Sequence, residues 1–313
     1  MRALTAPEIF GTWATVLTPF HDDDTLNLEA LDRELDLIIA AKPEGIYTHG
    51  TAGEFFNQTE KEWEAVATAV AKRCETAGVP FQLGASHPSP IMALDRIKRA
   101  RQIKPSAIQI ILPDWVCLNT DEIRSVISTY SETADGVGLV LYNPPHAKNV
   151  LGPAELDVLT QEFTAIVGVK VADGDDDWYT LMAATLRRIS VFVPGHHVAT
   201  GLTKGARGAY SNVACLHPSG AVEWASRSIE DPEWGLRVEA QINTFLTVAL
   251  APLIAKNYSN VTLDKALAMA GGHLGDVGHV RWPHATATPR EISRIRNAAR
   301  DMLPEFLTPA ADE

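Results

Sequence analysis

The chain has 313 residues, of which 46% are hydrophobic and 21% charged, as expected of a globular protein with one large or two medium domains. The net charge is -12, from 27 basic and 39 acidic residues, and no basic block occurs, so we expect no nucleic-acid partner. The longest apolar stretch, residues 245–255, is too short for a membrane span and contains Thr247 and Pro252.

Three widely separated cysteines, Cys74, Cys117 and Cys215, are odd in number. This favours reduced thiols over a disulfide framework or a zinc ribbon. The first residues also lack the apolar core of a signal peptide. We therefore expect a cytoplasmic protein without a membrane partner.

Short apolar runs that predict β-strands alternate with amphipathic stretches that predict helices. The expected strands cover residues 12–17, 45–49, 80–85, 107–112, 137–142, 165–171, 190–193 and 208–213. Helices are expected between them, for example over 28–41, 60–76 and 91–103. Asn27 and Thr59 are suitable helix N-caps, and Thr120 precedes a further helix.

The repeat of one strand and one helix about every 30 residues is typical of a βα unit. Eight units predict an α/β fold of the (β/α)8 TIM-barrel type, with the barrel over residues 1–225. The alternative, an open doubly wound sheet, usually shows a Gly-x-Gly-x-x-Gly loop after its first strand, and none occurs here. Residues 226–313 predict a C-terminal helical extension packed on the barrel, with two or three appended helices and Thr288 capping the last.

One lysine, Lys170, lies inside the otherwise apolar run 165–172. Because a buried ammonium is costly to desolvate, its pKa should fall, and a neutral amine can attack a carbonyl to form a Schiff base. The simpler interpretation is a strand-end lysine that reaches solvent and pairs with a carboxylate such as Asp173.

Other chemically useful residues follow the expected strands, where barrel enzymes place their active sites. Residues 50–54 form a glycine-containing turn whose backbone N–H groups suit an anion, although a tight turn with Gly53 at positive φ explains them equally well. Tyr142 ends a strand next to that of Lys170, at matching depth. A phenol beside an amine nucleophile suits imine chemistry, whereas a core tyrosine is the alternative.

These motifs resemble those of the dihydrodipicolinate synthase/N-acetylneuraminate lyase family of Schiff-base barrels, over nearly the whole chain. The matching segments are Gly50-Thr51-x-Gly53-Glu54, Tyr142-Asn143-x-Pro145, Gly168-Val169-Lys170, Thr18-Pro19-Phe20, Gly205-Ala206-x-Gly208 and Val280-Arg281-x-Pro283.

The resemblance implies an imine between Lys170 and a 2-oxo acid, commonly pyruvate, with no metal or organic cofactor. Tyr142 would be the proton relay, and Thr51 with the backbone amides of Thr51 and Ala52 would hold the carboxylate. The resemblance also implies a homo-oligomer, a dimer or a tetramer. The remaining substrate-binding candidates are Gly53, Gly195, Tyr210, Trp115 and His146.

The sequence departs from the family pattern at the substrate end. Ala52 replaces a second hydroxyl residue, which removes one donor to the carboxylate and costs about 1–2 kcal/mol of binding. Trp115 stands in the region of a tyrosine that relays protons across a subunit interface. Ala147 replaces an arginine that holds the second substrate's carboxylate. Residues 195–197, Gly-His-His, replace the common Gly-Asp-Asp.

We therefore expect a Schiff-base lyase, an aldolase or dehydratase acting on a 2-oxo acid such as pyruvate or a pyruvate-derived adduct. One alternative is a catalytically silent barrel that binds a 2-oxo acid. The other is an authentic dihydrodipicolinate synthase despite the missing arginine. The roles of His146, His196 and His197 stay open.

Overall fold

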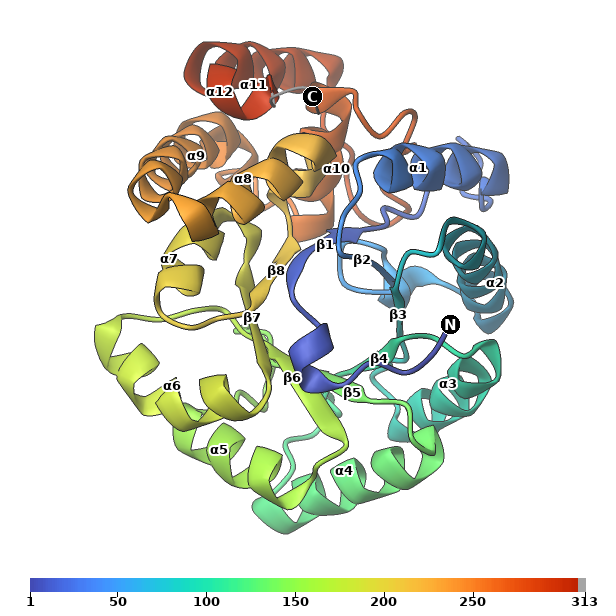
Figure 1. Cartoon of the computed structure of the whole chain (residues 1–313). Coiled ribbons are helices and arrows are strands. Elements are labelled where there is room, and N and C mark those ends of the chain that lie inside the picture. Colours follow the sequence, from blue (N-terminus) through green and yellow to red (C-terminus); the bar gives the residue numbers. More distant parts are fainter. Residues whose placement is uncertain (309–313) are drawn as a thin grey trace.

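The structure, a computed structural model, describes residues 1–308 and contains a closed barrel of eight parallel strands (Figure 1). The predicted TIM barrel is confirmed. Every expected strand is present, and several are shorter than the apolar runs suggested. The strands are β1 (Gly11–Thr15), β2 (Gly45–Thr48), β3 (Phe81–Gly84), β4 (Ala107–Ile110), β5 (Leu139–Tyr142), β6 (Ile166–Lys170), β7 (Ser190–Pro194) and β8 (Gly208–Ser211).

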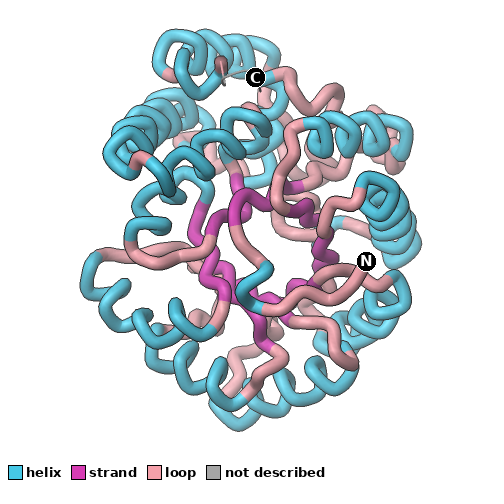
Figure 2. Tube along the Cα trace, in the orientation of Figure 1, coloured by secondary structure: helices cyan, strands magenta, loops and turns pink. Residues whose placement is uncertain are grey.

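Eight α-helices alternate with the strands and form the outer layer of the barrel (Figure 2). They are α1 (Leu28–Ala40), α2 (Glu60–Ala77), α3 (Pro90–Ile103), α4 (Thr120–Ala134), α5 (Pro153–Glu162), α6 (Asp176–Arg188), α7 (Val198–Thr203) and α8 (Pro218–Glu230). Short 3-10 turns η1 (Ala6–Glu8), η2 (Phe55–Asn57), η3 (Gly195–His197) and η4 (Val213–Cys215) interrupt the loops.

Side chains at the N-cap positions determine where several helices begin. Asn27 accepts a hydrogen bond from the Ala30 amide, and Thr59 caps α2 in the same way. The fourth helix begins at Thr120 itself, because Asn119 is its cap.

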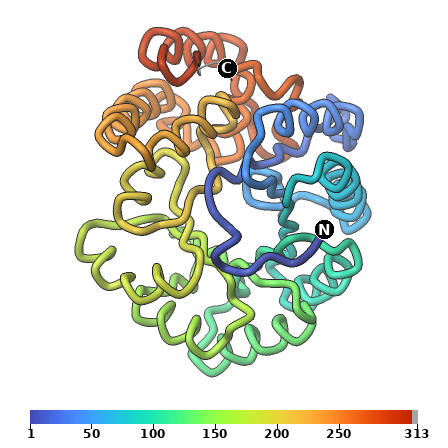
Figure 3. The backbone as a smooth tube through the Cα atoms, in the orientation of Figure 1, coloured from blue at the N-terminus to red at the C-terminus, as the bar shows by residue number. Residues whose placement is uncertain are grey.

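The barrel closes where β1 pairs with β8, with Gly11 opposite Gly208. A Cβ atom on Gly208 would lie only 2.0 Å from the Gly11 carbonyl oxygen, so glycine is required for the two strands to meet. The N-terminal segment crosses the end of the barrel near this seam (Figure 3). There Leu4 and Ile9 pack with Trp13 inside the barrel, which seals the end opposite the strand C-termini.

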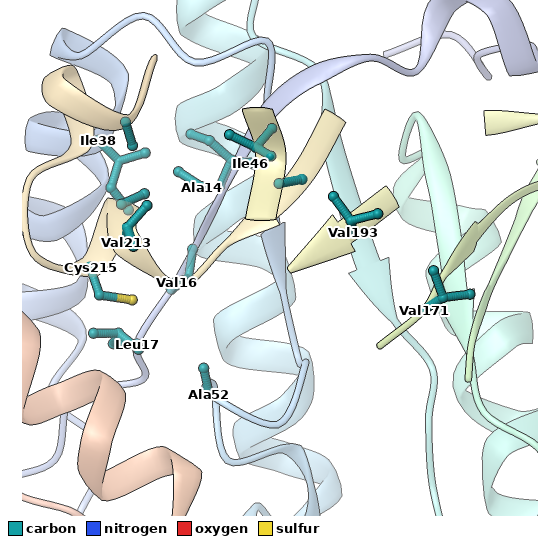
Figure 4. Close-up of a cluster of buried hydrophobic side chains, with 14 of the residues drawn as sticks. Ala14, Val16, Leu17, Ile38, Ile46, Ala52, Val171, Val193, Val213 and Cys215 are labelled. Carbon is teal, nitrogen blue, oxygen red and sulfur yellow. The ribbon is translucent and has the colours of Figure 1, made fainter. Parts of the chain in front are cut away.

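The main hydrophobic core lies between the strands and the surrounding helices. Figure 4 shows part of it, including Ala14, Ile46 and Val193 from three strands and Ile38 from α1. A smaller cluster fills the barrel itself and contains Trp13, Tyr47, Phe192 and Tyr210 among its members. Both layers are typical of TIM barrels, whose interior is packed with side chains.

The chain after the barrel forms α9 (Pro232–Ile254), α10 (Asn260–Gly271), α11 (Pro289–Met302) and the short α12 (Pro304–Leu307), which pack against one side of the barrel (Figure 1). Within residues 1–308 these are four appended helices where two or three were expected, and Thr288 caps α11 as expected. Within residues 1–308, no helix combines the length and apolar character that crossing a membrane requires.

A buried lysine ties α10 to the barrel. The Lys265 ammonium lies 2.9 Å from a carboxylate oxygen of Glu54, in the turn after β2, and both side chains are fully buried. The same ammonium donates to the carbonyl oxygens of Thr18 and His279. Because these partners come from three separate segments, the lysine fixes α10 over the C-terminal end of the barrel.

Candidate active site

A cavity of about 510 Å³ opens at the C-terminal end of the barrel, and Lys170 projects into it from the end of β6. Tyr142, the last residue of β5, is the register partner of Lys170. The two side chains therefore stand side by side, as the sequence predicted. Thr51 and Ala52 from the turn after β2 line the same cavity, as does Tyr210 from β8.

Three tyrosine rings surround the Lys170 ammonium. Its Nζ atom lies 4.3 Å from the centroid of the Tyr142 ring, 5.1 Å from that of Tyr47 and 5.5 Å from that of Tyr210. It also donates a 3.4 Å hydrogen bond to the Tyr47 hydroxyl. Burial among these rings lowers the pKa of Lys170 to about 8, so a sizeable fraction of the amine is neutral near physiological pH.

Asp264 on α10 lines the cavity with Lys170. Burial raises the pKa of its carboxyl to about 7, and the nearby Lys170 charge lowers it in part. In return, the Asp264 charge raises the pKa of Lys170, against the stronger effect of burial. The cavity therefore holds an acid and an amine that both titrate close to neutrality, which is typical of functional sites.

The phenols in the cavity are proton donors at neutral pH. Burial raises the pKa of Tyr142, and the hydrogen bond with Thr51 offsets this only in part. Burial raises the pKa of Tyr47 well above its usual value. The Tyr210 hydroxyl donates a 2.6 Å hydrogen bond to Gln82, so Tyr142 and Tyr47 are the two phenols beside the amine that this bond does not engage.

The turn at residues 50–54 follows β2 and is closed by its own backbone hydrogen bonds. Two residues at this turn, His49 and Glu54, have a left-handed backbone conformation, each with φ of 56°. The simple turn interpretation expected a positive φ at Gly53 instead, and this expectation is wrong. Gly53 is needed for space, because a Cβ atom there would lie 3.1 Å from the Val16 carbonyl oxygen. The amides of Gly53 and Glu54 bond to the carbonyls of Gly50 and Thr51.

The alternative role for Lys170, pairing with Asp173, is wrong. Asp173 instead lies 2.9 Å from Nδ1 of His197, which it keeps at a raised pKa. His196 lines the cavity, and its Nδ1 lies 3.2 Å from the Asn212 side-chain oxygen. Burial lowers the pKa of His196, so its imidazole is neutral at physiological pH.

Gly195 is buried behind the cavity wall. A Cβ atom there would lie 2.7 Å from the Ser211 hydroxyl and 2.8 Å from Asn212. It therefore allows η3 to pack against β8, and its neighbours Pro194 and His196 are the residues that line the cavity.

Trp115 and His146 lie in a neighbouring cavity of about 380 Å³, which shares Thr51 and Tyr142 with the first. Trp115 is 80% exposed, and its carbonyl accepts a hydrogen bond from the Lys148 ammonium. The structure thus separates these two candidates from the Lys170 cavity, on the far side of Tyr142 and Thr51.

Two titratable residues of the cavity, Tyr47 and Asp264, escaped the sequence analysis. Tyr47 lies in the middle of an apolar strand, and this pattern predicts a core aromatic residue. Asp264 lies on a helix well after the last strand, although it and Lys265 are the only charged residues of α10. The sequence feature that could have pointed to Asp264 is a charged residue on an otherwise apolar helix.

The site therefore combines a part-neutral amine, a phenol donor beside it, and a turn whose hydroxyl and amides suit a carboxylate. Comparison with protein-family models matches residues 8–297 to the dihydrodipicolinate synthetase family. The chain belongs to this family. The match covers the barrel together with α9, α10 and most of α11.

Curated relatives in this family are distant in sequence. The chain is 28% identical over 178 residues to 4-hydroxy-tetrahydrodipicolinate synthase of Staphylococcus carnosus, covering 56% of this chain and 59% of that protein. It is 25% identical over 162 residues to an uncharacterized DapA-like lyase of Pyrococcus horikoshii, covering 52% of this chain and 55% of that protein. The chain thus matches only a little over half the length of these relatives.

Solved structures of the family share the fold. An N-acetylneuraminate lyase from Fusobacterium nucleatum superposes with a TM-score of 0.82 at 16% identity, covering 95% of this chain and 99% of that one. A dihydrodipicolinate synthase family protein from Escherichia coli, solved with pyruvate, gives a TM-score of 0.79 at 20% identity, covering 94% and 98%.

Proposed function

We propose that this protein is a lyase that forms an imine between Lys170 and a 2-oxo acid such as pyruvate, without a metal or organic cofactor. The observation that carries the proposal is the Lys170 amine, with a pKa of about 8, enclosed by three tyrosine rings in a cavity at the barrel mouth. Family membership and the names of the lyase relatives support it.

In the proposed reaction, neutral Lys170 attacks the ketone carbon, and a proton moves from nitrogen to the former carbonyl oxygen. The resulting carbinolamine loses water once its hydroxyl is protonated, and Tyr142 is the proposed donor of that proton, supported by its ring 4.3 Å from the amine. The iminium then withdraws electrons from the neighbouring carbon.

This electron sink serves both aldol cleavage and dehydration. In cleavage, the bond breaks between the carbon next to the iminium and the carbon that follows it, and the bond's electrons enter the enamine. The hydroxyl group of the adduct gives up its proton, and an aldehyde forms. In dehydration, a proton leaves the neighbouring carbon and hydroxide leaves from the next one. Both reactions use the same lysine and the same proton carrier.

The oxo-acid carboxylate is proposed to bind at the turn after β2. Thr51 lines the cavity, and the amides of Thr51 and Ala52 lie outside the hydrogen bonds that close this turn among the described residues. Backbone N–H groups in such a turn form a concave site for an anion.

The test is reductive trapping. The intact protein is incubated with pyruvate and borohydride, then analysed by intact mass and peptide mapping, followed by a panel of other 2-oxo acids. A reduced adduct on Lys170 supports the proposal. A folded protein that gives no adduct with any 2-oxo acid contradicts it, and saturable binding without an adduct would identify a binding protein.

A further inference from the structure

The part of the cavity beyond Lys170 is formed by two helices outside the barrel. Leu246, Leu250 and Ile254 face it from α9, and Leu263 and Leu267 face it from α10. These positions recur three or four residues apart, so each set lies on one face of its helix. We call these five residues the apolar wall.

Polar neighbours on α9 offer little to a hydroxylated ligand. The Asn243 side-chain amide donates a 3.3 Å hydrogen bond to the His196 carbonyl, and the Thr247 hydroxyl donates a 2.8 Å bond to the Asn243 carbonyl. Each of these two side chains therefore already donates one hydrogen bond within the protein. A ligand hydroxyl group placed against the five side chains of the apolar wall would stay unpaired, which is unfavourable.

The cavity also lacks a cation for a second anionic group. Among the described residues that line it, Lys170 carries the only ammonium or guanidinium. Burial keeps the His196 imidazole neutral, and the buried phenols stay protonated. Asp264 contributes a negative charge as it titrates, so a second carboxylate on the substrate would meet repulsion and no cationic partner besides Lys170 among the described lining residues.

The cavity volume of about 510 Å³ lies within the range of pockets that enclose ligands much larger than a three-carbon acid. Building on the proposed function, we propose that the substrate is a 2-oxo acid, or its aldol adduct, whose chain beyond the oxo-acid group is uncharged and predominantly apolar. The oxo-acid end binds near Lys170 and Thr51, and the apolar chain packs against the wall formed by α9 and α10.

The experiment compares two probes of equal length, 2-oxohexanoate and 2-oxoadipate, which differ in a terminal methyl group against a terminal carboxylate. A six-carbon 2-oxo acid with a hydroxylated chain is the third probe. The concentration that gives half-maximal borohydride trapping on Lys170 is measured for each. We expect the concentration for half-maximal trapping to be at least about tenfold lower for 2-oxohexanoate than for either of the other two acids.

A variant pair locates the source of the preference. Ile254 lies at the cavity rim with 54% of its surface exposed, so Ile254→Arg places a cation beside the tail without disturbing the core. Val248→Arg is the matched control, because Val248 is 58% exposed on the same helix and does not line the cavity. We expect Ile254→Arg to improve trapping of 2-oxoadipate severalfold and Val248→Arg to leave it unchanged.

Equal trapping of 2-oxohexanoate and 2-oxoadipate by the wild-type protein would overturn this inference while leaving the imine function standing. So would a preference for the hydroxylated acid, or an equal effect of the two arginine variants. Absence of any adduct, with pyruvate included, would overturn the proposed function and this inference together.

Discussion

Tyr142 and Lys170 are register partners on β5 and β6, and the lysine Nζ atom lies 4.3 Å from the centre of the tyrosine ring. Parallel strands place equivalent positions at the same height in a barrel, so this pairing follows from where each strand ends. The ring shields the amine from water on one side, and Tyr142 also lines the cavity that a substrate would occupy. One strand pairing thus brings the proposed nucleophile and the proposed proton donor side by side.

Lys170→Ala is expected to abolish both turnover and the trapped adduct while leaving the barrel folded, because the substitution removes the nucleophile and a costly buried charge. Trapping with pyruvate and thermal unfolding followed by circular dichroism check this. Full activity in the variant would contradict the imine mechanism. A borohydride adduct at another lysine would do the same.

Imine formation is expected to accelerate with rising pH and to level off above about pH 8, since only neutral Lys170 attacks and its pKa is lowered to about 8. An ordinary lysine would give a midpoint near about 10.4. Initial rates of cyanoborohydride trapping with limiting pyruvate, measured across this pH range, provide the profile. A midpoint at the ordinary value would mean that burial does not perturb the amine.

Asp264→Asn is expected to move that midpoint to lower pH. The Asp264 charge favours the protonated form of Lys170, so its removal lowers the lysine pKa further. The groups that share this environment are Tyr47, Tyr142 and Cys215. Asp301→Asn, which removes an exposed carboxylate on α11, is the control and should leave the profile unchanged. Identical profiles for both variants would show that Asp264 does not act on Lys170.

Much of this site was predictable because it depends on strand ends. Lys170 is the one charged residue in an apolar strand, Tyr142 ends the neighbouring strand and Thr51 lies in the turn after β2, so the barrel pattern alone brings them together. Resemblance to a family added their chemical roles. The barrel seam, where Gly11 meets Gly208, required the structure, because no local pattern reveals which strands close a sheet.

The remaining differences concern loops and added helices. Asp264 was missed because its place depends on how α10 folds back over the barrel, which Lys265 fixes through contacts distant in the sequence. Trp115 and His146 were expected beside the substrate, yet their loops direct them into the adjacent cavity. Loop direction has no periodicity that a sequence pattern can report.

Tyr142→Phe is expected to reduce turnover by about 100-fold or more, since the ring still shields Lys170 but no longer exchanges protons. The trapped adduct with pyruvate should still form, at a reduced rate. Tyr47→Phe, which removes the hydroxyl 3.4 Å from the amine, is the comparison and should have the smaller effect on turnover. Equal losses in the two variants would argue against a specific proton-transfer role for Tyr142.

Ala52→Thr is expected to strengthen pyruvate binding, because it adds a hydroxyl to the turn that faces Lys170 across the cavity. One added hydrogen bond to a carboxylate contributes about 1–2 kcal/mol, or about 5- to 30-fold in affinity. The affinity for pyruvate is measured as the concentration that gives half-maximal trapping. Thr51→Val should change affinity in the opposite direction. A weaker affinity in Ala52→Thr, with the melting temperature unchanged, would place the carboxylate elsewhere.

Lys265→Met is expected to destabilise the protein by about 3–5 kcal/mol, since it leaves the buried Glu54 carboxylate without its cation. The carbonyls of Thr18 and His279 lose the same donor. Urea unfolding at pH 7 measures the change in the free energy of unfolding.

The matched control is Lys256→Met, which breaks the 2.7 Å ion pair between Lys256 and Glu291. Lys256 keeps 53% of its side chain exposed, so water replaces much of the lost interaction. This change should cost much less stability than Lys265→Met. If the two variants lost equal stability, Lys265 would not be the residue that anchors α10, and the position of Asp264 opposite Lys170 would need another explanation.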